Sequence, residues 1–200
     1  MRTLKNPSER FTYGDYRHWP EEERWELIDG EAYDISPAPS RTHQQWVLAL
    51  ARQIAEFLDD KPCDIYVAPF DVRLPEGNEA DDAVQTVVQP DISVICDPSK
   101  LDEAGCRGAP DFIIEVLSPA TSSKDQTIKK KLYERHGVQE YWLVHPTDRV
   151  LTRYFLEDGH YSPALIEAIS GTTEVRILPG LAIDWSFAEP ESEPVRHPPR

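Results

Sequence analysis

Hydrophobic and polar residues follow two periods along this chain, and these periods predict where helices and strands lie. Apolar residues recur at helical spacing between residues 42 and 58, so we predict a helix there, with Ser40 or Thr42 as its cap. Its apolar stripe is expected to consist of Val47, Leu48, Ala51, Ile54, Ala55 and Leu58. A second helix is predicted over about residues 122–137, ending at Gly137 because glycine suits a helix C-terminus.

Shorter apolar runs bounded by turn residues predict strands. Residues 25–35 are expected to form a hairpin, since Asp29-Gly30 is a two-residue turn in which both positions tolerate positive φ. A short helix and a turn are predicted before it, over residues 12–24. The further predicted strands are residues 64–74, 88–96, 110–117, 139–146 and 149–155, with more strands inside 161–178.

The predicted order of elements indicates the fold class. Helix, strand, strand, strand, helix and strand follow one another, with additional β-structure at both ends, which is typical of an α/β (α+β) domain around a mixed sheet flanked by helices. A length of 200 residues suits one domain. We predict a flexible N-terminal arm over residues 1–11, the domain over 12–188 and a disordered, proline-rich and charged tail over 189–200.

Two carboxylates interrupt stretches that otherwise predict buried strands. Glu115 lies within residues 112–117, where both faces of a strand would be apolar, and Asp91 interrupts the apolar run of residues 88–96. A buried carboxylate is costly unless it is paired, protonated or bound to a metal. Two of them on neighbouring strands suggest a cation between them.

Composition narrows the possible environments and partners. No run of about 18 apolar residues predicts a membrane span, and no apolar segment typical of a signal peptide follows Met1, so we predict a cytoplasmic protein. The three cysteines, Cys63, Cys96 and Cys106, lack the spacing of a zinc site and are predicted to be reduced. The net charge of −15 opposes loose attraction to nucleic acid.

Several motifs together resemble the Uma2 family, also called DUF820. These motifs are Leu27-Ile28-Asp29-Gly30-Glu31, His43, Gln89-Pro90-Asp91, Glu115-Val116-Leu117-Ser118-Pro119, Asp125, Lys129, Tyr133 and residues 137–144. The resemblance covers roughly residues 12–185. It implies a restriction-endonuclease-like core of the PD-(D/E)XK nuclease superfamily, and a divalent-metal-dependent phosphodiesterase that acts on DNA.

The chain departs from the superfamily pattern at the position of the basic residue. The pattern places a lysine two residues after the acidic residue of the third strand, where this chain has Leu117. Lys129 on the following helix is the best substitute, because it shares a helix stripe with Asp125 and Tyr133, whereas Lys130 and Lys131 point elsewhere. A simple i, i+4 pair of Lys129 with Asp125 remains the alternative, and Tyr133 is expected to pack or donate a hydrogen bond.

The resemblance implies a site in which Asp91 and Glu115 hold Mg²⁺ or Mn²⁺. Such hard cations prefer oxygen ligands, and Mg²⁺ needs one or two carboxylates when water completes its shell. Lys129 would orient the attacking water or neutralise the scissile phosphate. Glu31 is a candidate further carboxylate. His43 is a candidate hydrogen-bond donor to a phosphate, or a residue that orients Glu31. For each residue a structural role in a salt bridge, turn or helix start stays open.

Three functional hypotheses follow. The first is a metal-dependent DNA endonuclease, and by analogy with the superfamily its expected partners are DNA and a second copy of the chain, with no membrane. The second is a nuclease fold without turnover that binds nucleic acid or a protein, motivated by the net charge and by Leu117. The third is a hydrolase of another phosphodiester, such as RNA or a nucleotide, which only the analogy with the family separates from the first.

Overall fold

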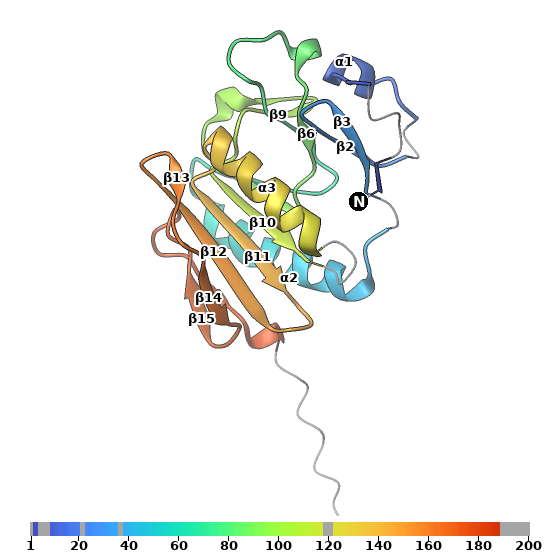
Figure 1. Ribbon diagram of the computed structural model, residues 1–200. Helices are drawn as coiled ribbons and strands as arrows, with labels where there is room; N and C mark the ends of the chain where they lie inside the picture. Colours follow the sequence, from blue (N-terminus) through green and yellow to red (C-terminus); the bar gives the residue numbers. More distant parts are fainter. Residues whose placement is uncertain (1, 4–8, 21–22, 36–37, 118–121, 189–200) are drawn as a thin grey trace, which may run out of the picture.

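The computed structural model describes residues 2–3, 9–20, 23–35, 38–117 and 122–188 (Figure 1). Its α-helices are α1 (Tyr13–Tyr16), α2 (Arg41–Leu58) and α3 (Ser122–His136), and its short 3-10 helices are η1 (Asp81–Ala83), η2 (Pro98–Lys100) and η3 (Ser186–Ala188). Its strands are β1 (Arg2–Thr3), β2 (Trp25–Ile28), β3 (Glu31–Asp34), β4 (Asp64–Val67), β5 (Val72–Arg73), β6 (Val87–Val88), β7 (Ile92–Ile95), β8 (Leu101–Asp102), β9 (Gly105–Arg107), β10 (Phe112–Val116), β11 (Glu140–His145), β12 (Val150–Glu157), β13 (His160–Tyr161), β14 (Leu165–Ala168), β15 (Thr172–Glu174) and β16 (Ala182–Asp184).

A mixed central sheet has the strand order β13-β12-β11-β10-β7-β4, and β14 also pairs with β12. Strands β4, β7 and β10 are antiparallel, whereas β10 and β11 are parallel and are joined through α3. Helix α3 lies in front of this sheet and α2 lies behind it in Figure 1. The order α2-β4-β7-β10-α3-β11 confirms the predicted α+β fold class and the predicted order of the core elements.

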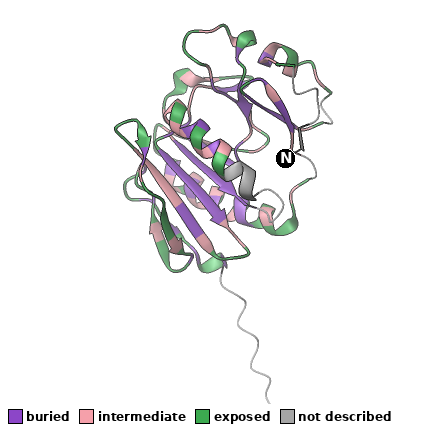
Figure 2. Cartoon of the chain, viewed as in Figure 1, coloured by how far each residue is buried: buried purple, intermediate pink, exposed green. Residues whose placement is uncertain are grey.

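The central strands are buried on both faces, as their continuous apolar runs predict. Every residue of β10 is buried, and β10 and β11 form the purple centre of Figure 2. One face packs against α2 through Trp46, Val47, Leu50, Ile54 and Leu58. The other face packs against α3, where Leu132 and Tyr133 join a cluster with Ile113 and Tyr141.

A second sheet, with the order β1-β3-β2-β6-β5-β9-β8, lies beside the α3 face of the central sheet. Its presence corrects two predictions: residues 64–74 and 88–96 are not single strands, because each divides between the two sheets as β4 with β5 and as β6 with β7. Pro69 and Pro90 lie at the divisions, and proline has no N–H to donate to a strand ladder. Asp91 therefore precedes β7 instead of lying inside it.

The hairpin and the first long helix form as predicted. Asp29 and Gly30 have φ of 51° and 77°, so both adopt the left-handed turn conformation between β2 and β3. Ser40 caps α2 by accepting a hydrogen bond from the backbone N of His43 at 3.2 Å. One residue of the predicted stripe is wrong: Leu48 is 70% exposed, since it points about 120° from the centre of the buried face, and Leu50 is buried instead.

The prediction of three reduced cysteines is also wrong, because Cys63 and Cys96 form a disulfide. Asp64 pairs with Ile95 in the antiparallel β4–β7 ladder, so the residues just outside this pair, Cys63 and Cys96, lie opposite each other. A sequence separation of 33 residues hid this proximity. Cys106 is buried and free.

Part of the predicted N-terminal arm belongs to the second sheet. Within the predicted N-terminal arm, β1 pairs with β3, whereas the predicted tail over residues 189–200 lies outside the described residues. No helix in the described part of the chain is both long and apolar enough to cross a lipid bilayer.

Candidate active site

Asp91 and Glu115 meet where β7 and β10 lie side by side. In this antiparallel pair Ile92 is opposite Ile114, so Asp91 is next to the end of β10 that carries Glu115. Asp91 Oδ2 accepts a hydrogen bond from the backbone N of Val116 at 2.7 Å. This bond fixes the carboxylate of Asp91 against β10, the strand that carries Glu115. The side chain of Asp91 is 17% exposed and that of Glu115 is 10% exposed.

Helix α3 adds two side chains that reach the same oxygen of Glu115. Lys129 Nζ and the Tyr133 hydroxyl each donate to Glu115 Oε1 at 2.9 Å. Residues four apart share a helix face, which explains why both point inward. The structure thus brings Lys129 to the carboxylates, while Lys130 lies over the ring of Tyr154. Asp125, the third member of the predicted stripe, has its side chain outside the described part of the structure.

Glu26 is a buried member of this cluster that the sequence reasoning missed. It lies on β2 with 1% exposure, and its Oε1 accepts hydrogen bonds from Lys129 Nζ at 2.9 Å and from the backbone N of Gln89 at 2.8 Å. Its Oε2 is buried without a hydrogen-bond partner. A signal was present, since Glu26 stands in the apolar run Trp25-Glu26-Leu27-Ile28 in the same way that Glu115 stands in its strand.

The structure places Glu31 differently from the expectation that it supplies a further carboxylate. Glu31 lies on β3, is 37% exposed, forms an ion pair with Arg10 at 3.2 Å and accepts a hydrogen bond from the Tyr33 hydroxyl. Among the described residues, no hydrogen bond or ion pair joins it to Asp91 or Glu115. The hairpin contributes Glu26 to the cluster instead.

His43, in the first turn of α2, contacts Asp91 and not Glu31. Its Nε2 lies 3.0 Å from Asp91 Oδ2, while its Nδ1 is buried without a hydrogen-bond partner. Burial lowers the pKa of His43, but the hydrogen bond to Asp91 and the charges of Asp91 and Glu115 outweigh it, and the pKa is raised above 6.5. His43 and the Val116 amide thus both contact Oδ2 of Asp91 and orient its carboxylate.

The electrostatics of the cluster favour an additional positive charge. The pKa of Glu115 is raised to about 7, because burial and the charges of Asp91 and Glu26 raise it by more than Lys129 lowers it. One ammonium group therefore serves two carboxylates, with a third close by. Burial and the charge of Glu115 raise the pKa of Tyr133 far above 10, so Tyr133 stays a hydrogen-bond donor.

A divalent cation fits the oxygens that these carboxylates leave open. The described residues hydrogen-bond Asp91 through Oδ2 and Glu115 through Oε1, so Oδ1 of Asp91 and Oε2 of Glu115 carry no bond from them. No group of three or more His, Cys, Asp or Glu side chains in the described chain forms a closed metal centre. The residues therefore suit a cation such as Mg²⁺ that is held by two carboxylates and completes its shell with water or phosphate.

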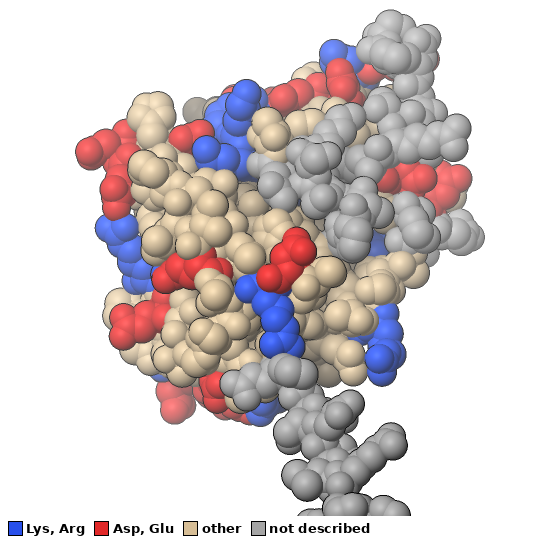
Figure 3. Space-filling model, turned by 60° about the horizontal axis from the view of Figure 1, so that its bottom comes forward, with Lys and Arg blue, Asp and Glu red and all other residues tan. Residues whose placement is uncertain are grey.

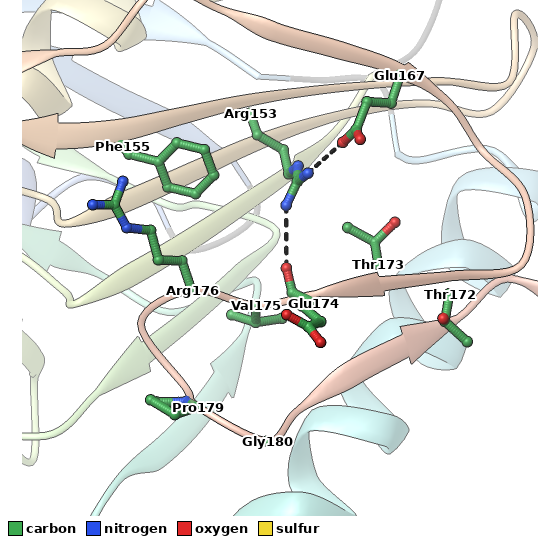
Figure 4. A pocket seen from close by; sticks show the side chains of 10 residues that line it. All are labelled: Arg153, Phe155, Glu167, Thr172, Thr173, Glu174, Val175, Arg176, Pro179 and Gly180. Carbon is green, nitrogen blue, oxygen red and sulfur yellow. Dashed lines mark hydrogen bonds and ion pairs between the residues drawn. The ribbon is translucent and has the colours of Figure 1, made fainter.

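A separate hollow of about 610 Å³ lies at the C-terminal hairpins (Figure 4). Arg153 at its wall pairs with Glu167, and Arg176 pairs with Glu157. The remaining lining residues are Phe155, Thr172, Thr173, Glu174, Val175, Pro179 and Gly180. Its cations are each matched by a nearby carboxylate, and none of the predicted site residues lines it.

The fold agrees with what comparison with known proteins finds. The chain matches the family Uma2, described as a putative restriction endonuclease, over residues 13–187. It is 27% identical over 155 residues to the uncharacterized protein slr1290 of Synechocystis sp., covering 76% of this chain and 77% of that protein. It is similar in fold to a crystal structure of a putative nuclease belonging to DUF820 from Anabaena variabilis, with a TM-score of 0.70 and 20% identity, covering 89% of this chain and 97% of the other. Because the family match spans most of its length, the chain belongs to the Uma2 family.

Proposed function

We propose that this protein is a divalent-metal-dependent endonuclease that hydrolyses DNA phosphodiester bonds at Asp91 and Glu115. The observation that carries the proposal is the buried Glu115–Lys129 contact of 2.9 Å beside Asp91, with one oxygen of each carboxylate left open. Family membership supports a nuclease-like function. The DNA substrate, the metal and the catalytic step are proposed here.

Each residue of the cluster has a distinct role in the proposed reaction. Asp91 Oδ1 and Glu115 Oε2 would hold Mg²⁺ or Mn²⁺, which when bound lowers the pKa of a coordinated water and polarises a phosphoryl oxygen. The ammonium of Lys129 lies where it can orient the attacking water or offset charge that develops on the phosphate. Tyr133 fixes the other oxygen of Glu115, and His43 fixes the other oxygen of Asp91.

Glu26 acts on the reaction through Lys129. Because Lys129 Nζ contacts both Glu26 and Glu115 at 2.9 Å, Glu26 keeps the ammonium charged and in place when Glu115 turns toward a cation. Glu26 is thus a positioning residue in this proposal. It takes the place that Glu31 was expected to fill in the sequence-based hypothesis.

A specific observation also favours the second function, a nuclease fold that binds without turnover. The net charge is −15, and basic and acidic side chains are interspersed on the face shown in Figure 3. In addition, the position of the superfamily lysine is occupied by Leu117, which is buried in the core. This reading predicts binding of a partner that survives EDTA and no cleavage. The homodimer stays a prediction from the superfamily.

The deciding experiment combines metal binding with cleavage. Calorimetry with Mn²⁺ should show binding by the wild type and its loss in Glu115→Gln, and supercoiled plasmid should be nicked by the wild type with Mg²⁺ or Mn²⁺ but not with EDTA. Asp91→Asn and Lys129→Met should lose cleavage while remaining folded. The matched control is Glu56→Gln, which removes an exposed carboxylate paired with Arg52 on α2. Full cleavage by Asp91→Asn, Glu115→Gln or Lys129→Met would refute the site.

A further inference from the structure

Arg24 stands at the rim of the carboxylate cluster, directly before β2 and two residues before Glu26. Residues two apart on an extended strand point to the same side, so Arg24 and Glu26 face the same neighbours. Both contact Gln89: the backbone N of Gln89 donates to Glu26, and Arg24 Nη2 donates to Gln89 Oε1 at 3.1 Å. Gln89 is itself two residues before Asp91, so a single residue, Gln89, links Arg24 to the segment that carries Asp91.

The orientation of the Gln89 amide is fixed from its other end. Gln89 Nε2 donates to Asp71 Oδ1 at 2.9 Å and to the Tyr16 hydroxyl oxygen at 3.2 Å. The hydroxyl of Tyr16 in turn donates to Asp71 Oδ1 at 2.9 Å. Because a carboxylate only accepts when ionised, the NH₂ group must face Asp71 and the amide oxygen must face Arg24. Asp71 and Tyr16 therefore fix the amide of Gln89 so that its neutral oxygen accepts the hydrogen bond from the Arg24 guanidinium.

The positive charge of Arg24 has no carboxylate partner in the described part of the chain. Its hydrogen bond goes to the neutral Gln89, and its Nε is buried without a partner. Other arginines of the same region differ, because Arg17 pairs with Asp82 and Arg73 pairs with Asp81 and Asp102. A half-buried cation beside an acidic cluster, with no carboxylate partner among the described residues, is unusual in a chain of net charge −15.

We propose that Arg24 binds a backbone phosphate of the DNA that occupies the site. A guanidinium presents its donors in a planar fork that matches phosphate oxygens, and here Gln89 holds Nη2 while the hydrogen bonds of the described residues leave Nη1 open. Arg24 also lies close enough to the cluster for its charge to act on His43. It supplies local positive charge that the overall composition lacks. The inference rests on the proposed function, since it takes the same DNA as its ligand.

Equilibrium DNA binding tests this role without turnover. Fluorescence anisotropy of a labelled duplex, with Ca²⁺ in place of Mg²⁺, would be measured between about 50 and about 200 mM salt. Arg24→Gln should weaken binding about tenfold at low salt, because a hydrogen bond to a charged group is lost. It should also lower the slope of log K against log salt by about 0.9, the value for one phosphate contact. Arg24→Lys should restore the slope but not the full affinity, since lysine offers no fork.

Arg17→Gln is the matched control, because it removes an arginine of the same region that is already paired with Asp82. It should leave both the affinity and the slope unchanged. Equal affinity and slope in the wild type and Arg24→Gln, or no DNA binding by the wild type at all, would overturn the assignment. A wild type that cleaves plasmid while Arg24→Gln binds normally would refute this inference alone. Binding with the expected Arg24 effect but without cleavage would refute the endonuclease and keep the phosphate contact.

Discussion

Two regions of the molecule invite comparison as binding sites, the open hollow at the C-terminal hairpins and the carboxylate cluster between β7, β10, α3 and β2. The hollow has a volume of about 610 Å³ and two arginines on its wall, and each arginine is matched by one glutamate. In the cluster, one lysine with 6% exposure contacts both Glu26 and Glu115, and Asp91 adds a third carboxylate.

The two regions differ in whether their charges are balanced, and this difference is a better guide to a functional site than the size of a hollow. In the hollow each arginine has one carboxylate partner, so positive and negative charges balance and the hollow offers room without an electrostatic need for a ligand. In the cluster, negative charge exceeds positive charge in a region of low dielectric, where each imbalance costs more. A cation or a proton relieves that imbalance, and this need marks the cluster as the better candidate for a functional site.

The largest expected effect that separates the two regions is on stability. Lys129→Met should destabilise the metal-free fold by about 3–5 kcal/mol, because it leaves buried carboxylates without their cation. Arg176→Gln in the hollow should cost about 0–1 kcal/mol, since the ion pair with Glu157 is 60% and 52% exposed. Urea denaturation with EDTA present measures both free energies of unfolding.

The pH dependence of the Lys129→Met effect sharpens the same test. The pKa of Glu115 is already raised to about 7, chiefly by burial, and losing Lys129 removes a charge that lowers it. The carboxyl groups of the variant should therefore take up protons as the pH falls, and the loss of stability should shrink. A loss below about 1 kcal/mol even at about pH 9, where the carboxyl groups stay ionised longest, would mean that Lys129 is not the shared counter-ion.

Replacing Glu26 should have a smaller effect on stability and a clear effect on the reaction. In Glu26→Gln the amide oxygen can still accept from the backbone N of Gln89, but of the two carboxylates that contact Lys129 in the described part of the chain only Glu115 remains. We expect a loss of about 1–3 kcal/mol in stability. We also expect weaker Mn²⁺ binding and a lower kcat with little change in KM, because the substitution removes negative charge and frees Lys129 to hold Glu115.

The matched control for Glu26 is Glu31→Gln, which changes the other glutamate of the hairpin. Glu31 is exposed and paired with Arg10, so metal binding and kcat should remain at the wild-type level. If Glu26→Gln lost stability but kept normal metal affinity and kcat, Glu26 would have only a structural role, in the contact between the hairpin and α3. If Glu31→Gln lost activity, the sequence-based choice of Glu31 would be restored.

These two glutamates also show how far the sequence could predict the site. Asp91, Glu115 and Lys129 carried signals of their own: two carboxylates in apolar runs and a lysine at the right helix spacing, and the structure brings all three together. Glu26 carried the same kind of signal but lay beside the more familiar Asp29-Gly30-Glu31 turn. Which hairpin residue reaches α3 depends on how the second sheet packs on the first, and no local pattern encodes that contact.

The fold divides in a similar way. Helical stripes, glycine turns and continuous apolar strands were readable because their causes are local, as in α2, α3 and β10. Residues 64–74 and 88–96 are each predicted as a single strand because apolar residues recur along their length, yet each passes from one sheet to the other. The Cys63–Cys96 disulfide was missed for the same reason, since it depends on the register of β4 against β7.

Tyr133→Phe should produce a moderate effect confined to the cluster. The substitution keeps the buried ring and removes the hydroxyl that donates to Glu115 Oε1 at 2.9 Å. We expect a loss of about 1–3 kcal/mol in stability, at the lower end because Lys129 still occupies the same oxygen. Metal binding should persist, because Oε2 of Glu115 is untouched. Complete loss of cleavage in a folded Tyr133→Phe protein would instead give Tyr133 a direct part in the chemistry.

The smallest expected effect is the pH dependence that His43 contributes. Its pKa in the folded protein is raised above 6.5 by Asp91, so its stabilising contribution is fully present below the unfolded pKa and is lost as the pH rises through the folded pKa. Relative to His43→Gln, the wild type should therefore be more stable at about pH 6 than at about pH 9. Urea denaturation of both proteins in EDTA measures the difference. Because the Nδ1 atom of His43 is buried without a partner, the gain is reduced from what a fully bonded imidazolium would give. An equal difference at both pH values would show that the pKa of His43 is the same in the folded and the unfolded protein, so that Asp91 does not raise it.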